Sequence, residues 1–278
     1  MRPLLIKQIQ KKIEDPEGTI PFTKYHGAGN DFILIDQREK KYIDTSDSEK
    51  VRQLCDRHFG IGADGLMLLQ YCDDCDFEMI YFNPDGSLGM FCGNGARCIV
   101  AFAKLLQVIR HKARFKAADG MHFAFILEDD SVELKMGDVN EIEINKDFYF
   151  LNTGTVHYVK FVADAYKIDV NLEGKKIRHS KRFEKDGVNV NFVNPTENGI
   201  CIATFERGVE AETLACGTGI TAAAICNYLN NPIDKNKNID VLAKGGNLQV
   251  RFETDGKSFR ELWLCGPTKL VYAGKIVL

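Results

Sequence analysis

Two cysteines, each followed by a glycine-rich turn and an apolar run, are the residues of this chain best suited to chemistry. Cys92 begins the stretch Cys-Gly-Asn-Gly-Ala-Arg, and Cys216 begins the stretch Cys-Gly-Thr-Gly. Glycine leaves backbone N–H groups unobstructed at a helix N-terminus, where partial positive charge favours an anion such as a thiolate or a substrate carboxylate. We therefore expect each cysteine to have a lowered pKa and to act as a base near neutral pH.

A free cysteine is more often a small buried apolar residue than a reactive one. Three features favour function for this pair: the motif occurs twice, a glycine follows each thiol, and neither cysteine belongs to a recognisable disulfide or zinc spacing. Two thiols facing one carbon across a cleft would exchange protons with it, one removing a proton and the other returning one to the opposite face. The predicted result is inversion of a stereocentre, with two helix N-termini stabilising the developing negative charge and with no cofactor or metal.

The composition is that of an ordinary water-soluble protein with two domains. The chain has 278 residues, of which 45% are hydrophobic and 27% charged, and its net charge is −3. This length suits two domains of about 130 residues each. The charge gives no argument for a nucleic-acid or membrane partner, so we expect a small-molecule substrate.

The nine cysteines are an odd number spread over a long chain. This pattern indicates free thiols in a reducing compartment, and we expect a cytoplasmic protein because no signal peptide or membrane-length apolar run is present. The isolated Cys72-Asp-Asp-Cys75 has no second pair at zinc spacing and is interpreted as a surface turn.

The elements that must position the two thiols follow from hydrophobic patterning. The runs after Cys92 and Cys216 are apolar around most of a helix circumference, which predicts two buried helices. Strand-like segments on both sides predict an α/β fold in which each domain is a strongly curved sheet around one central helix, with the active site in the cleft between domains. A further helix is expected over residues 45–59.

The expected domain organisation has three parts. Residues 1–20 form a charged N-terminal extension, residues 21–137 a first domain, and residues 138–266 a second domain, while residues 267–278 return to the first. The segment Gly60-Ile-Gly-Ala-Asp-Gly65 matches the dinucleotide motif by letter only, because it follows a helix and precedes a strand. We therefore exclude NAD binding there.

Six motifs in order carry a resemblance to a known family. They are His26–Phe32 (HGAGNDF), Asp56–Gly65 (DRHFGIGADG), Phe82–Ser87 (FNPDGS), Cys92–Cys98 (CGNGARC), Phe205–Gly208 (FERG) and Ala215–Gly219 (ACGTG). From Phe22 onward the chain resembles the diaminopimelate epimerases. This resemblance implies a cofactor-independent enzyme that interconverts LL- and meso-2,6-diaminopimelate in lysine and peptidoglycan precursor biosynthesis, with two pseudosymmetric domains.

The resemblance also implies roles for individual residues. Cys92 and Cys216 would be the acid/base pair, Gly93-Asn94 and Gly217-Thr218 would offer amides to the reacting carboxylate, and Glu206 would lie near the reacting amine. Arg207 would clamp the distal carboxylate, because a guanidinium pairs with it through two hydrogen bonds. The full set of implied substrate-binding residues is Asn30, Asn83, Gly93, Asn94, Thr155, Asn189, Glu206, Arg207, Gly217 and Thr218.

Two positions depart from the family pattern, and both fall on recognition of the distal end. Thr155 stands where the family usually has an asparagine, and it lacks the second donor of an amide. Gly65 stands where many members have a glutamine. These departures affect the expected substrate range rather than the reaction type.

Other functions stay open at this point. A proline or hydroxyproline racemase, or an amino-acid racemase of relaxed specificity, would share the fold and a similar second cysteine motif. A non-catalytic binding protein or a thiol redox protein would be of a different class, and a redox enzyme would turn over a thiol couple. The sequence leaves the oligomeric state open, including a homodimer.

Overall fold

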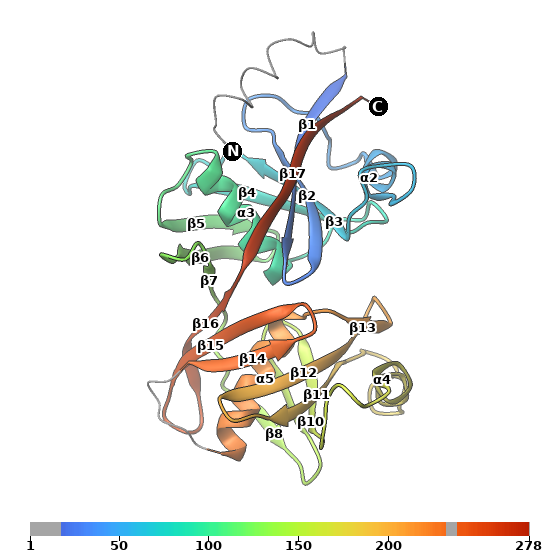
Figure 1. Ribbon diagram of the computed structural model, residues 1–278, viewed down its shortest axis with the longest axis vertical. Coiled ribbons are helices and arrows are strands. Elements are labelled where there is room, and N and C mark those ends of the chain that lie inside the picture. The colour runs from blue at the N-terminus through green and yellow to red at the C-terminus, as the bar shows by residue number, and fades with distance from the viewer. Residues whose placement is uncertain (1–17, 232–237, 278) are drawn as a thin grey trace.

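The computed structural model describes residues 18–231 and 238–277 and shows two lobes stacked along the long axis of the molecule (Figure 1). Most of the expected N-terminal extension, residues 1–17, lies outside the described residues, and β1 begins at Thr19. All strands belong to one continuous hydrogen-bonded network that passes through both lobes. The predicted α/β fold with two domains is confirmed.

The elements of the first lobe are β1 (Thr19–Gly27), β2 (Asn30–Asp36), α2 (Ser48–Cys55), β3 (Gly65–Gln70), β4 (Phe77–Phe82), α3 (Gly93–Leu105), β5 (Lys112–Ala117), β6 (Gly120–Ile126), β7 (Val132–Lys135) and β17 (Thr268–Val277). Those of the second lobe are β8 (Ile142–Ile144), β9 (Tyr149–Asn152), β10 (Val156–Phe161), α4 (Val170–Arg178), β11 (Asn189–Pro195), β12 (Gly199–Glu206), β13 (Ala211–Thr213), α5 (Gly217–Asn230), β14 (Ile239–Ala243), β15 (Gly246–Thr254) and β16 (Phe259–Gly266).

The strand pairings repeat in the same order in the two lobes. β2 and β3 pair in parallel, β3 and β4 antiparallel, and β4 and β5 in parallel. In the second lobe β10 and β11 pair in parallel, β11 and β12 antiparallel, and β12 and β14 in parallel. The two halves of the chain therefore have the same topology, with α3 of the first corresponding to α5 of the second.

Each lobe encloses one helix. α3 packs against β1, β2, β3, β6, β7 and β17, and α5 packs against β9, β10, β11, β12, β14, β15 and β16. Nearly every side chain of α5 is buried, as are those of α3 from Asn94 to Val100. Because strands surround them, these helices hold their N-termini in fixed positions.

The lobes are joined through equivalent strands. β7 of the first lobe pairs antiparallel with β16 of the second, from Val132 opposite Gly266 to Lys135 opposite Trp263. After β16 the chain returns as β17, which pairs with β1 along its whole length and is the long dark red strand in Figure 1. The expected domain limit at residue 137 lies in the connection between β7 and β8.

Two sequence-based expectations need correction here. The helix expected over residues 45–59 is only α2, because the Asp56 side chain accepts hydrogen bonds from the backbone N–H groups of His58 and Phe59 and ends the helix in a turn. Cys72 and Cys75 form a disulfide rather than remaining free. The loop between β3 and β4 brings their Cα atoms to 5.4 Å, a separation that a disulfide spans.

Candidate active site

The two expected reactive cysteines occupy the same local position. Cys92 is the N-cap of α3 with φ −135° and ψ 113°, and Cys216 is the N-cap of α5 with φ −111° and ψ 112°. In both cases the backbone is extended at the cysteine and becomes helical at the following glycine. The free N–H groups of the first helical turn are thus directed toward the thiol.

The N-termini of α3 and α5 meet between the lobes. A Cβ atom placed on Gly217 would lie 3.9 Å from the Cα of Gly93 and 3.0 Å from a methyl carbon of Leu264. The two turns are therefore in near contact, and the tighter restriction on a side chain at position 217 comes from Leu264. The two helix dipoles therefore direct partial positive charge into one region, which favours a negatively charged group there.

The expected lowering of the thiol pKa values is wrong. Burial raises the pKa of Cys92 to about 11, and the backbone N–H groups of Gly95 and Asn94 only partly oppose this rise. Burial likewise raises the pKa of Cys216 to about 12, with the Glu206 carboxylate adding to it and the Thr218 hydroxyl opposing it. Loss of water around the thiol outweighs the helix N-terminus, so both groups are protonated at neutral pH.

Asn30 and Asn94 connect Cys92 to the opposite lobe. The thiol of Cys92 lies 3.6 Å from Asn30 Oδ1, which also accepts a hydrogen bond of 3.3 Å from Asn94 Nδ2. Asn94 Nδ2 donates a second bond of 2.8 Å to the carbonyl oxygen of Ala215, the residue before Cys216. One buried amide thus bridges the turns that carry the two thiols.

An ionic cluster of Asp31, Arg57 and Asp64 holds the side chain of Asn30 in place. Asn30 Nδ2 donates to Asp64 Oδ2 at 2.8 Å, and Arg57 bonds both Asp64 and Asp31. Burial acts to raise the pKa of Asp31, but hydrogen bonds from Arg57 and Lys24 bring it well below its usual range. The cluster leaves Asn30 Oδ1 directed at the thiol.

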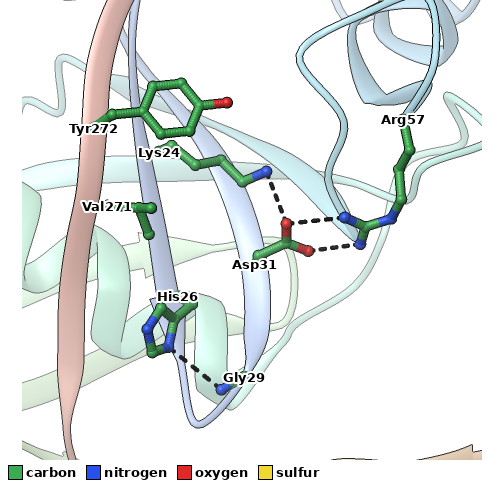
Figure 2. A pocket seen from close by; sticks show the side chains of 7 residues that line it. All are labelled: Lys24, His26, Gly29, Asp31, Arg57, Val271 and Tyr272. Carbon is green, nitrogen blue, oxygen red and sulfur yellow. Dashed lines mark hydrogen bonds and ion pairs between the residues drawn. The ribbon is translucent and has the colours of Figure 1, made fainter.

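A surface hollow of about 320 Å³ lies on the outer side of this cluster (Figure 2). It is lined by Lys24, His26, Gly29, Asp31, Arg57, Val271 and Tyr272. Figure 2 shows Asp31 between Lys24 and Arg57, so the two cations are already paired with a carboxylate. Neither reactive cysteine lines this hollow.

The second lobe contributes a network around Thr218. Its hydroxyl lies 3.5 Å from the thiol of Cys216, 2.9 Å from His157 Nε2 and 3.1 Å from the hydroxyl of Thr155. Thr155 in turn accepts a hydrogen bond of 3.0 Å from Asn189 Nδ2. The threonine that departs from the family pattern is therefore tied to two other predicted site residues.

His157 is a buried neutral imidazole within this network. Burial lowers its pKa to about 3, and the charge of Arg207 adds to the effect. Asn191 Nδ2 lies 3.0 Å from His157 Nδ1 and 3.2 Å from the carbonyl oxygen of Tyr158, which can only accept. Nδ1 therefore accepts, the proton is on Nε2, and the ring donates toward Thr218 or Thr155.

Glu206 and Tyr81 are ionisable groups that interact electrostatically with the thiol pair. Burial raises the pKa of Glu206, and its charge raises the pKa values of Cys92 and Cys216. Burial also raises the pKa of Tyr81, with contributions from Cys92 and Glu206. The Tyr81 ring lies where a side chain at position 65 would project, since a Cβ on Gly65 would be 2.7 Å from it.

Arg207 and Asn83 lie at the ends of equivalent strands. The backbone N–H of Arg207 donates to Asn189 Oδ1 at 2.8 Å, and its exposed guanidinium donates to the carbonyl oxygen of Asp186. Asn83 follows β4, and its side chain bonds Ser87 within its own turn. Among the described residues no hydrogen bond joins Asn83 to the other predicted site residues.

The structure thus connects most of the predicted set in two groups, one around Asn30, Asn94 and Cys92 and one around Thr218, Thr155 and Asn189. The sequence motifs alone assign no role to five further residues of this region, namely His157, Asn191, Tyr81, Asp64 and Arg97. His157, Asp64 and Arg97 lie inside the quoted motifs or beside Thr155, so proximity to a motif was the available signal. Nothing local marks Asn191 or Tyr81, because ordinary strand residues share their pattern.

Among residues 18–231 and 238–277 no three His, Cys, Asp or Glu side chains are grouped as metal ligands would be. In that same part of the chain no helix combines the length and apolar character needed to cross a membrane.

Solved structures with the same fold have little sequence similarity to this chain. A phenazine biosynthesis protein from Bacillus anthracis superposes with a TM-score of 0.72 at 13% identity, covering 94% of this chain and 99% of that one. A probable proline racemase from Agrobacterium radiobacter superposes with a TM-score of 0.65 at 15% identity, covering 93% of each chain. At such identities the likeness concerns the fold alone.

Sequence comparison is more specific. The family model described as diaminopimelate epimerase matches residues 22–142 and 149–271. The diaminopimelate epimerase of Flavobacterium psychrophilum is 45% identical over 250 residues, covering 90% of this chain and 97% of that protein. The diaminopimelate epimerase of Chlorobaculum tepidum is 40% identical, covering 91% of this chain and 99% of that protein. With equivalent cysteines capping two enclosed helices and this extent of similarity, the chain belongs to the diaminopimelate epimerase family.

Proposed function

We propose that this protein interconverts LL- and meso-2,6-diaminopimelate by a two-base mechanism that uses Cys92 and Cys216 and no cofactor. The observation that carries the proposal is the meeting of two equivalent helix N-termini, each capped by a cysteine. Such a site offers a base on one face of a carbon and an acid on the other. The family assignment supplies the substrate.

The reaction balances with one proton removed and one returned. One sulfur, as thiolate, takes the α-proton, and the electron pair left on carbon delocalises into the adjacent carboxylate. The other thiol then delivers its proton to the opposite face and becomes the thiolate. Backbone N–H groups at residues 93–94 and 217–218 stabilise the carboxylate as its charge increases.

Substrate binding must produce the thiolate, since burial keeps both thiols protonated in the free site. The α-ammonium group of the substrate brings a positive charge next to the thiols, and Glu206 is placed to pair with it. A nearby cation favours ionisation of a buried thiol. The enzyme therefore activates its base only when an amino acid is bound.

The distal end of the substrate is assigned to the surface formed by Asn30, Asn83, Asn189 and Arg207. Thr155 occupies a position beside Asn189 and Thr218 and contributes a hydroxyl there. We also infer action in the cytoplasm, where the seven free cysteines would stay reduced.

The direct test is to incubate the purified protein separately with LL-diaminopimelate, meso-diaminopimelate, L-proline and trans-4-hydroxy-L-proline, and to separate the stereoisomers by chiral chromatography. We expect both diaminopimelate isomers to reach the same mixture and the prolines to remain unchanged. Turnover of a proline without turnover of diaminopimelate would contradict the proposed substrate.

A further inference from the structure

Arg97 is a fully buried arginine on α3, one turn beyond Cys92. Its Nη2 donates to Asn94 Oδ1 at 2.9 Å, and its Nη1 reaches the carbonyl oxygen of Gly93 at 3.5 Å. Its Nε has no hydrogen-bond partner, and no carboxylate among the described residues pairs with the guanidinium. A buried cation without a counter-ion is costly unless negative charge forms near it.

Glycines at strand ends make room for this side chain. A Cβ on Gly266, at the end of β16, would lie 3.0 Å from Arg97 Nε and 3.1 Å from its Cζ. A Cβ on Gly27, at the end of β1, would lie 3.5 Å from Nη2 and 2.9 Å from the carbonyl oxygen of Asn94. The guanidinium therefore lies where strands of both lobes approach the thiol region.

Arg97 determines which way the Asn94 amide faces. Because Arg97 can only donate, Asn94 Oδ1 must face it, and Nδ2 then faces Asn30 Oδ1 and the carbonyl oxygen of Ala215. Those contacts join the Cys92 turn to the Cys216 turn. Loss of the guanidinium would leave Asn94 Oδ1 without its donor, so the bridge between the turns would be held only by the bonds that Nδ2 makes.

The repeated fold provides an internal comparison. Thr221 lies as far beyond Cys216 as Arg97 lies beyond Cys92, is equally buried, and donates to the carbonyl oxygen of Gly217 at 3.0 Å. Both side chains therefore bond the glycine that follows the cysteine. Only the first lobe adds a charge.

The ionisable groups that face Cys92 are Arg97 and Cys98 from α3, Tyr81 from β4, Glu206 from β12 and Cys216 from the start of α5. Those that face Arg97 are Cys92, Cys98 and Cys265. Burial raises the pKa of Cys92, Glu206 raises it further, and the positive charge of Arg97 opposes this rise. The groups that act most on the pKa of Cys216 are Glu206, Thr218, Gly219 and Cys92, none of which is a cation.

We propose that Arg97 is a positioning residue that sets the Asn94 bridge between the two thiol-bearing turns, and that its buried charge makes Cys92 the more easily ionised thiol of the pair. The proposal concerns an asymmetry between two sites that the fold makes equivalent. Its catalytic part rests on the proposed function, whereas its electrostatic part concerns the thiols alone.

The first measurement uses the unmodified protein. The rates at which iodoacetamide alkylates Cys92 and Cys216 are followed from pH 6 to 10 by peptide mass spectrometry. We expect the Cys92 profile to lie at lower pH than the Cys216 profile, by about one unit for one nearby buried charge. Coincident profiles, or Cys216 ionising first, would overturn the proposal.

Two variants of Arg97 then separate the effect of its charge from the effect of its hydrogen bonds. In Arg97→Met, which keeps the length without charge or donors, the Cys92 profile should move to higher pH, and kcat should fall on the order of 100-fold with a much smaller change in KM. Arg97→Lys should restore the Cys92 profile more fully than kcat, because an ammonium keeps the charge but cannot bond Asn94 and Gly93 as a fork.

Thr221→Val is the matched control, since it removes the equivalent hydrogen bond in the second lobe without changing charge. It should leave the Cys92 alkylation profile unchanged. If Arg97→Met folds, as judged by circular dichroism, and keeps both the wild-type Cys92 profile and kcat, the proposal fails. If Arg97→Met does not fold, Arg97→Lys and the wild-type profiles decide it. A wild-type protein without epimerase activity would count against the proposed function and leave the thiol comparison intact.

Discussion

Burial controls the chemistry of individual residues in this site more than the helix termini do. Cys92 and Cys216 are held as thiols, Glu206 has a raised pKa, and His157 is neutral with a pKa of about 3. The two thiols and the imidazole are therefore held uncharged by burial, and burial also makes the Glu206 carboxyl harder to ionise. A substrate cation beside the thiols would lower the cost of forming a thiolate there. Such a site would therefore select substrates that carry a positive charge.

Replacing Arg207 by lysine should weaken substrate binding without affecting the fold. The exposed guanidinium is available to a carboxylate apart from one bond to the Asp186 carbonyl, and lysine replaces its planar fork by a point charge. We expect a loss of about 1 to 3 kcal/mol in transition-state stabilisation, measured as kcat/KM. Arg52→Lys, on the exposed face of α2, is the control, and equal kinetics for both variants would place Arg207 outside the site.

His157 should make the protein less stable in acid. The folded-state pKa of about 3 lies below the ordinary value of about 6.5, so the unfolded chain binds the proton more readily. The contribution of His157 is therefore fully present above pH 6.5 and is lost as the pH falls toward 3.

Thermal unfolding between pH 7.5 and 4 measures this loss. The wild-type melting temperature should fall more steeply with pH than that of His157→Gln, which has no titrating ring. Asp31 also contributes to acid sensitivity, but it is unchanged in both proteins. Parallel curves would show that His157 is not the group responsible.

At the scale of elements, the sequence predicts correctly those segments in which the apolar residues are also the buried residues. The apolar runs after Cys92 and Cys216 predict α3 and α5, and Met121–Ile126 predicts most of β6. The sequence KARFKA of β5 has the alternation of a strand, but its signal is weak because two of its three buried residues are alanines, which have little strand preference. α4 was missed because it contains Gly174 and buries only that residue and Val170, against a neighbouring strand.

The site was predictable only as far as motifs reached. The two cysteines and their glycines follow from local sequence, whereas the hydrogen bonds that orient Asn94 and Thr218 come from residues far along the chain. The expectation of lowered thiol pKa values was wrong because these values also depend on residues far along the chain. A helix N-terminus is visible in the sequence, but the burial imposed by the other lobe is not.

Gly219, in the first turn of α5, should be required for the packing of the second lobe. A Cβ on Gly219 would lie 2.5 Å from Asn191 Oδ1, which accepts a hydrogen bond from Thr204, and moving this amide would also break the bond from its Nδ2 to His157. We expect Gly219→Ala to reduce the free energy of unfolding by about 1 to 3 kcal/mol in urea. Gly93→Ala is the control, because the nearest atom to its Cβ would be 3.9 Å away, and equal losses for both would contradict this account.

At the scale of the whole molecule, the two lobes are related by a repeat that brings equivalent parts together. β7 pairs with its equivalent β16, and the turn before α3 meets the turn before α5. In the proposed mechanism these two similar half-sites act on one carbon from opposite faces. The two halves differ at equivalent positions, with Arg97 opposite Thr221 and Asn94 opposite Thr218, so the site itself is not symmetric.

If the two thiols share one carbon, as proposed, an oxidant should also be able to join them when no substrate is bound, slowly at neutral pH because burial keeps both protonated and faster as the pH rises. Mild oxidant should inactivate the protein by joining Cys92 to Cys216, dithiothreitol should restore activity, and substrate should protect it. Peptide mapping without reduction checks the linkage and distinguishes it from the Cys72–Cys75 bond already present. Inactivation by a bond that involves neither Cys92 nor Cys216 would contradict the proposed geometry.

The most direct test of the central claim is epimerisation in heavy water. With LL-diaminopimelate as substrate, the first meso product should carry deuterium at the inverted carbon, because the proton returned comes from a thiol that has exchanged with solvent. Substrate recovered early should remain unlabelled. Cys92→Ala and Cys216→Ala should both lose epimerisation while keeping the wild-type circular dichroism spectrum. Unlabelled product, or substantial epimerisation by either alanine variant, would contradict the two-base account.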